Sequence, residues 1–267
     1  MGLNKKSVDN INVNGKRVLV RCDSDVVANI DLKTALKLHK KRDAEVTVVY
    51  AHGKKPMGQA DMMHYTFDNE GRIISVNFNP SDDCDYSLDT IIINRQLLID
   101  IVTSKTAEGK VSLSHSIFED CYKTNRIFGF KHEGFSAVMD SEESYFKANL
   151  ALLDCSVRSN LFRRDNPIYT KTRDDMPARY GLSAKTSSAI VADGCLIEGT
   201  VKNSVLFRGV KVAKGAVIEN CILMEGTVVG ENSTLKNMIT DRFVTVSENK
   251  DLDGKDGTFY LPKKASI

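Results

Sequence analysis

The sequence has no strong excess of either charge and no long apolar run. Its 267 residues include 37 Lys and Arg against 35 Asp and Glu, so the formal net charge is only +2. This balance gives no reason to expect a nucleic acid as a partner. No stretch of about 18 apolar residues predicts a membrane-spanning helix, and the N-terminus lacks the apolar core of a secretion signal. We therefore expect a cytoplasmic protein that binds neither nucleic acid nor membrane.

Paired cysteine motifs are also missing. The six cysteines are scattered along the chain, and no two of them form a C-x-x-C pair. In a chain without a secretion signal, this pattern indicates reduced thiols that pack as small hydrophobic side chains.

A six-residue repeat fills the C-terminal part of the chain from about Ser188. Aliphatic residues recur every six positions, and a second small or β-branched residue follows each of them four residues later. Glycines and asparagines between these positions tolerate positive φ, which suits tight turns. The first set is Val191, Ile197, Val212, Ile218, Met224, Val229 and Leu235, and the second set is Cys195, Val201, Ala216, Ile222, Val228, Ser233 and Ile239.

Each unit of this repeat predicts one short strand followed by one turn. Three units close a triangular coil whose aliphatic residues stack inside, so that each coil covers the apolar face of its neighbour. The pattern therefore predicts a left-handed parallel β-helix over residues 188–267.

Residues 24–155 combine helical and strand patterns and predict a mixed α/β region. The segment 31–43 has leucines among basic residues, with Asp31 as a helix N-cap. It lies between two β-branched segments, 18–23 and 45–50, which predicts a βαβ unit with a parallel strand pair.

The remaining elements are predicted by turn and capping signals. We expect a hairpin over 65–78 that turns at 68–71, a helix over 90–104, strands over 126–131 and 134–140, and a helix over 141–154 that begins at a Ser N-cap. Residues 156–187 contain two prolines and many charges. They predict a linker with little regular structure.

The linker carries a family resemblance. NPIYTKTRDDMPARYG at 166–181, followed by ADGCLIEGTVKNSVLFRGVKV, resembles the linker and β-helix of bacterial glucose-1-phosphate adenylyltransferases, also called ADP-glucose pyrophosphorylases. CDSDVVANIDL at 22–32 and SYFKANLALLD at 144–154 are similar to the same family, and in particular to its D-type (regulatory) subunit. The resemblance runs from about residue 22 to 267. It implies a nucleotidyltransferase-like (Rossmann-like) domain at 24–155 that is truncated at its N-terminus.

A different resemblance covers residues 1–23. NKKSVDNINVNGKRVLVRCD at 4–23 is similar to the N-terminus of bacterial phosphoglycerate kinases, but the Phe-Asn-Val-Pro run that follows the Asp in those kinases is absent. The chain therefore looks like a fusion of two metabolic genes at a shared Cys-Asp.

The resemblance also implies where catalytic chemistry would lie. Catalytic members join ATP and glucose 1-phosphate with the help of Mg²⁺. Their first metal carboxylate matches Asp25, whereas the second falls on Val138, which cannot bind a cation, with Asp140 two residues further on. The Glu-Lys-Pro that holds the sugar phosphate is replaced by Phe-Asn-Pro at 78–80, and the Gly-rich phosphate loop has no counterpart. We assign no catalytic residue and treat Asp25 as a weak remnant of a metal site.

For this chain the resemblance implies a regulatory or structural subunit of glycogen (ADP-glucose) biosynthesis. The expected partner is a catalytic subunit of glucose-1-phosphate adenylyltransferase, in a hetero-oligomer. The candidates for contact with an anionic effector are the basic linker residues Arg158, Arg163, Arg164 and Lys171. A solvated charged linker is the plain alternative for these residues.

Other functions stay open at this point. The chain can be a non-functional fusion or gene fragment, or a remnant of phosphoglycerate kinase. A hexapeptide-repeat acyltransferase would use the same β-helix with a His general base within or beside the coils. All five histidines precede residue 133, which disfavours that reaction.

Overall fold

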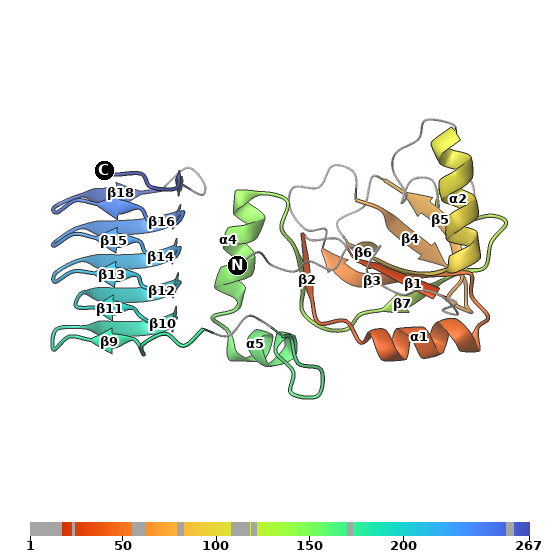
Figure 1. The fold of residues 1–267 in the computed structure, drawn as a ribbon, viewed down its shortest axis with the longest axis horizontal. Coiled ribbons are helices and arrows are strands. Elements are labelled where there is room, and N and C mark those ends of the chain that lie inside the picture. Colours follow the sequence, from red (N-terminus) through yellow and green to blue (C-terminus); the bar gives the residue numbers. More distant parts are fainter. Residues whose placement is uncertain are drawn as a thin grey trace. The chain divides into compact units, whose positions relative to one another are not determined.

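The computed structural model describes residues 18–22, 25–54, 62–78, 83–107, 118, 122–169, 173–254 and 259–267. The chain divides into two compact units, both drawn in Figure 1. Unit 1 comprises residues 1–26, 30–55 and 60–133, and unit 2 comprises residues 27–29, 56–59 and 134–267.

Unit 1 is built on a mixed β-sheet with the helices α1 and α2. The strand order is β5-β4-β6-β3-β7, and β1 also pairs with β6. β3 runs parallel to β7 and antiparallel to β6. The elements are β1 (Val18–Cys22), α1 (Leu32–Lys41), β3 (Val46–Lys54), β4 (His64–Phe67), β5 (Ile73–Asn77), β6 (Asp83–Asn94), α2 (Arg95–Ala107) and β7 (Ile127–Lys131).

The strand β6 separates the two strands that the sequence predicts to pair. Thr90 of β6 lies opposite Cys22 of β1 on one side and Val49 of β3 on the other. The prediction of a directly paired β1 and β3 is therefore wrong, because β6 lies between them and runs antiparallel to both. β6 suits this central place because most of its 12 residues are buried, as expected of a strand covered on both faces.

The predicted helix over 90–104 begins too early. Ile91, Ile92 and Ile93 are buried and complete β6, and helix α2 starts only at Arg95. A run of β-branched residues packs well in a sheet that is covered on both faces, whereas it loses side-chain freedom in a helix. Packing of the sheet therefore decided the end of this strand.

Two local predictions in unit 1 are confirmed. Asp31 is the N-cap of α1, and its carboxylate accepts a hydrogen bond from the backbone N–H of Thr34 at 3.0 Å. In the hairpin of β4 and β5, Asp68 Oδ1 accepts hydrogen bonds from the N–H groups of Glu70 and Arg72 at 2.9 and 2.8 Å. Both are short-range contacts of the kind that Asp makes at caps and turns.

A buried histidine should make the stability of unit 1 depend on pH. His39 of α1 is buried, and its Nδ1 lies 2.8 Å from Thr47 Oγ1 of β3. Burial lowers the pKa of His39 from its usual 6.5, while nearby Asp43 opposes this shift. The unfolded chain then binds the extra proton. The stability of unit 1 should therefore be full above pH 6.5 and decline as the pH falls below this value towards the folded pKa.

The check is urea unfolding of unit 1 at a series of pH values between about 7 and 5. The substitution His39→Gln should flatten the decline, because the amide does not titrate and can still bond Thr47. An equal pH slope in both proteins would contradict the assignment.

Unit 2 begins with a small sheet and two helices. β2 (Val26–Ala28) pairs with β8 (Ser136–Val138), and α4 (Glu142–Ala151) and α5 (Cys155–Leu161) follow. Ser141 is the predicted N-cap of α4 and forms a capping box with Ser144. The predicted helix over 141–154 is thus split at its C-terminal end, because Asp154 caps the new helix α5. Residues 134–155 cluster with unit 2, although the sequence placed them with the α/β region.

The rest of unit 2 is a parallel β-helix, so the predicted fold class is confirmed. One sheet has the order β10-β12-β14-β16-β18, with β19 also paired to β16, and a second has the order β17-β15-β13-β11-β9. The strands are β9 (Arg179–Tyr180), β10 (Lys185–Val191), β11 (Leu196–Ile197), β12 (Thr200–Leu206), β13 (Lys211–Val212), β14 (Val217–Leu223), β15 (Val228–Val229), β16 (Thr234–Thr240), β17 (Thr245–Val246), β18 (Asp251–Asp253) and β19 (Phe259–Leu261). β9 and the start of β10 lie in the predicted linker, which therefore has more regular structure than expected.

One coil of this β-helix usually contains 17 residues, which is one fewer than three six-residue units would give. The register places Ile218 beside Val201 and Leu235 beside Ile218, a spacing of 17 residues that also separates the paired corner asparagines. This short coil explains why the six-residue pattern in the sequence slips by one position.

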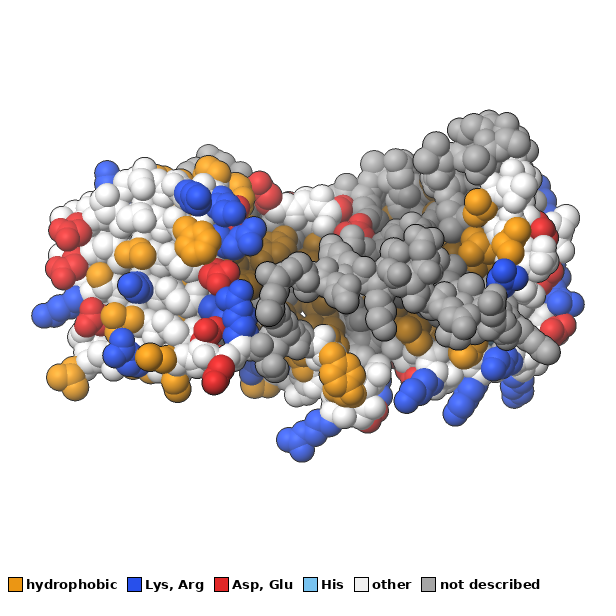
Figure 2. All heavy atoms as spheres, viewed as in Figure 1, with side chains coloured by type: hydrophobic (Ala, Val, Ile, Leu, Met, Phe, Trp, Pro, Cys, Tyr) orange, Lys and Arg blue, Asp and Glu red, His pale blue; other side chains and the backbone are white. Residues whose placement is uncertain are grey.

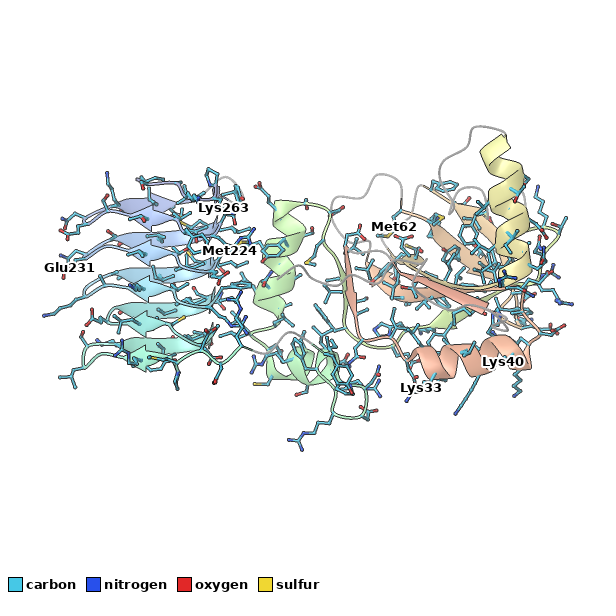
Figure 3. The ribbon with its side chains drawn as sticks, viewed as in Figure 1. Lys33, Lys40, Met62, Met224, Glu231 and Lys263 are labelled. Carbon is cyan, nitrogen blue, oxygen red and sulfur yellow. The ribbon has the colours of Figure 1, made fainter. Side chains whose placement is uncertain are left out.

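Only part of the predicted aliphatic set lies inside the coils. The interior cluster includes Ile197, Val201, Val212, Ala216, Ile218, Cys221, Leu223, Val229 and Leu235. Ile222 and Ile239 instead form, with Val205, an outer cluster that packs against Tyr145 and Phe146 of α4. Met224 also belongs to this cluster and lies on the side of the β-helix next to α4, whereas Glu231 lies on the opposite side (Figure 3). The expectation that Ile222, Ile239 and Met224 stack inside is therefore wrong.

An asparagine ladder marks one corner of the coils. Asn203, Asn220 and Asn237 have positive φ values of 46°, 55° and 52°. Each side-chain amide donates to the next coil, from Asn203 to Asn220 at 3.0 Å, from Asn220 to Asn237 at 2.5 Å, and from Asn237 to Asp253 at 2.8 Å. Asn tolerates this backbone region better than most residues, and here its side chain also links the coils.

Candidate functional site

The predicted metal residue Asp25 directly precedes β2. Its Oδ1 atom is buried and has no hydrogen-bond partner. Val138, where the resemblance expects the second carboxylate, lies at the end of β8 with its side chain only 2% exposed. Asp140 is exposed, and its backbone N–H donates to Ser144 Oγ at the start of α4. Across the described residues, no three His, Cys, Asp or Glu side chains are grouped so that they can hold a metal ion.

Phe78 occupies the position of the expected sugar-phosphate Glu. Its ring packs against the hydrophobic core of unit 1, a cluster that includes the buried residues Tyr65 and Ile73. This packing gives Phe78 a structural role. Asn79 and Pro80, the other two residues of this motif, lie outside the described residues.

The four basic residues predicted to face an effector have different surroundings. Arg158 Nη1 donates to the carbonyls of Leu152 and Leu153 at 2.7 and 2.8 Å, which places its positive charge at the C-terminal end of α4. Arg163 forms an ion pair with Asp165. Arg164 is exposed, and Lys171 lies outside the described residues.

A cavity in unit 2 was not predicted from the sequence. Its volume is about 410 Å³, and it lies between the β-helix and residues 173–177, which we call the strap. Arg173 of the strap donates to Glu225 at 2.9 Å, and Asp175 lies 3.4 Å from the guanidinium of Arg208. We call this cavity the strap pocket.

The strap pocket follows one corner of the coils. Gly194, Gly209 and Gly226 line it and have φ values of 75°, 68° and 72°, and Phe243 takes the same place in the next coil with a φ of 61°. A Cβ atom on Gly209 would meet no other atom within 4 Å, whereas one on Gly226 would lie 2.5 Å from the ring of Phe243. The glycines therefore add no side chain to the lining of the pocket, and the Phe243 ring lies against Gly226.

Charged residues alternate along this corner. Asp193, Arg208 and Glu225 directly precede the three glycines, and their carbonyls accept the hydrogen bonds of the next coil at 2.9 to 3.1 Å. The recurrence of a charged residue before glycine at the coil spacing was the sequence signal for this site. On the face of the β-helix in Figure 2, basic, acidic and hydrophobic side chains are intermingled, so no single charge dominates it.

Comparisons with known proteins agree with this architecture. The family described as GlmU-like, C-terminal hexapeptide, matches residues 175–257. The chain is 27% identical over 197 residues to the glycogen biosynthesis protein GlgD of Bacillus subtilis, across 74% of this chain and 48% of that protein. It is 27% identical over 208 residues to the glucose-1-phosphate adenylyltransferase of Thermosipho africanus, across 75% of this chain and 50% of that protein.

The chain is similar to these adenylyltransferases and to GlgD over about three quarters of its length. The GlgD of Geobacillus stearothermophilus is 35% identical over 132 residues, across 49% of this chain and 38% of that protein. The resemblance inferred from the sequence is thus confirmed, and the chain spans about half the length of the adenylyltransferase and GlgD relatives it matches. Within the described ranges, every helix is too short or too polar to span a bilayer.

Proposed function

We propose that the chain is a non-catalytic regulatory or structural subunit of glucose-1-phosphate adenylyltransferase in glycogen biosynthesis. The observation that carries this proposal is the similarity to a protein named for glycogen biosynthesis, GlgD, over 74% of the chain. The partner is a catalytic subunit, and the two form a hetero-oligomer in the cytoplasm.

The replaced site residues support a role without catalysis. Nucleotidyl transfer needs a metal held by carboxylates and a cation that holds the sugar phosphate. Val138 has no ligand atom, and Phe78 contributes its ring to the core of unit 1. Asp25 alone would hold Mg²⁺ weakly, because protein Mg²⁺ sites usually use one or two carboxylates together with substrate phosphates. In the proposed assembly, ATP and Mg²⁺ bind to the catalytic chain.

An anionic effector remains part of the proposal, and the candidate contact residues in the linker are Arg158, Arg163, Arg164 and Lys171. Arg158 and Arg163 also have partners within unit 2.

The alternatives are a gene fragment without function and an acyltransferase of the hexapeptide type. Residues 133–267 contain no histidine, so the β-helix offers no His base for acyl transfer. A phosphoglycerate kinase remnant is disfavoured because its resemblance ends at Asp23.

Co-expression with the catalytic chain of the same genome tests the proposal. An affinity tag on this chain should capture the catalytic chain, and the captured complex should make ADP-glucose in the presence of ATP, glucose 1-phosphate and Mg²⁺. This chain alone should make none. The catalytic chain should respond differently to sugar phosphates when this chain is bound.

Two results would contradict the proposal in different ways. Synthesis of ADP-glucose by this chain alone would show that it is catalytic. A folded chain that captures no catalytic subunit would favour the gene fragment.

A further inference from the structure

The charges of the strap pocket do not all neutralise one another. Arg173 pairs with Glu225 and Arg208 pairs with Asp175. Arg179 and Asp193 also line the pocket, and in the described part of the chain neither side chain has an ion-pair or hydrogen-bond partner. One guanidinium and one carboxylate are therefore left over in a pocket with no net charge.

Apolar groups lie beside these two charges. Met176 of the strap is 76% exposed and Phe243 is 49% exposed, and both line the pocket. Large apolar side chains with this much exposed surface gain from contact with an apolar ligand group. The volume of about 410 Å³ lies in the range that small-molecule sites occupy.

We propose that the strap pocket binds a small zwitterion with an apolar or aromatic group, such as an amino acid. Arg179 binds the ligand carboxylate, because the guanidinium fork matches two carboxylate oxygens. Asp193 accepts hydrogen bonds from the ligand ammonium. The apolar group of the ligand lies against Met176 and Phe243. A purely anionic ligand would leave Asp193 unmatched, and a purely cationic ligand would leave Arg179 unmatched.

Three matched probes test this assignment on the full chain by titration calorimetry. L-phenylalanine carries both charges, 3-phenylpropanoate lacks the ammonium group, and 2-phenylethylamine lacks the carboxylate. We expect saturable binding of L-phenylalanine, with each analogue bound at least about tenfold more weakly, since each loses one charge-assisted contact. The test uses this chain alone, so its result does not depend on the proposed subunit role.

Variants locate the two contacts. Arg179→Gln should reduce the affinity for L-phenylalanine about tenfold and leave the affinity for 2-phenylethylamine unchanged. Asp193→Asn should reduce the affinity for L-phenylalanine and 2-phenylethylamine and leave the affinity for 3-phenylpropanoate unchanged. Arg95→Gln, at an exposed arginine of unit 1 that is outside the pocket lining, is the matched control and should bind normally. Each variant is checked for an unchanged melting curve.

Three outcomes would overturn the proposal. They are the absence of saturable L-phenylalanine binding, equal affinity for all three probes, and tighter binding of inorganic phosphate that depends on Arg179. The last outcome would make the pocket an anion site.

Discussion

Replacing Gly199 by Ala should destabilise the β-helix by more than about 2 kcal/mol. A Cβ atom at this position would lie 2.4 Å from the carbonyl oxygen of Ala216 and 2.8 Å from that of Ala213. Both atoms belong to the backbone of the next coil, so no side-chain rotation relieves the clash. The coils must separate locally, and the backbone hydrogen bonds between β12 and β14 weaken. Hydrogen exchange of the β12 and β14 amides, read by mass spectrometry, measures this loss.

Gly209→Ala is the matched control for this prediction. A Cβ atom at Gly209 meets nothing within 4 Å, but the φ of 68° is unfavourable for Ala. The expected cost is only about 1 kcal/mol, from the backbone conformation alone. Equal destabilisation by the two substitutions would show that coil contact does not limit the residue at position 199.

Replacing Ile222 by Asp should release α4 from the β-helix. Ile222 is 0% exposed and packs, with Val205 and Ile239, against Tyr145 and Phe146 of α4. Removing a buried aliphatic side chain costs roughly 2–5 kcal/mol, and burying a carboxylate without a partner adds to this cost. We expect a loss of more than about 3 kcal/mol for the packed state. The α4 amides should exchange much faster, while the interior β-helix amides change less.

Thr245→Asp adds the same charge at an exposed position of the short strand β17 and should leave α4 protected. Ile222→Ala provides a second comparison without any charge. If α4 stayed protected in Ile222→Asp, the outer cluster would not be what holds this helix. The assignment of Ile222 to an outer cluster, separate from the interior cluster of the coils, would then be wrong.

The residues that the sequence placed correctly are those that act over a few positions. Asp31 and Ser141 cap their helices, and Asp68 forms the hairpin turn. Each contact joins residues two to four positions apart, so the local sequence is enough to predict it. The β-helix was predictable for a related reason, since each coil repeats the pattern of the one before.

The strap pocket was not predicted, because charged residues of the strap have partners that are distant in sequence. Arg173 bonds Glu225, 52 residues away, and both line the strap pocket. Arg158, a candidate for effector contact, donates to the carbonyls of Leu152 and Leu153 at the end of α4. Residue type alone gives the charge of such a side chain, but the fold selects its partner.

The sequence by itself determined the helix caps, the hairpin turn and the repeat, because these follow from local preference and periodicity, and its motifs carried the family resemblance. Only the tertiary structure decided that β6 lies between β1 and β3 and that Ile91 to Ile93 extend a strand. It also decided that Ile218 faces the interior while Ile222 faces α4. Side chains four positions apart share a face in a regular strand, but the corner at Asn220, with its φ of 55°, lies between these two residues and changes the alternation. An aliphatic side chain gains burial on either face, so its direction depends on this turn and on which face another element covers.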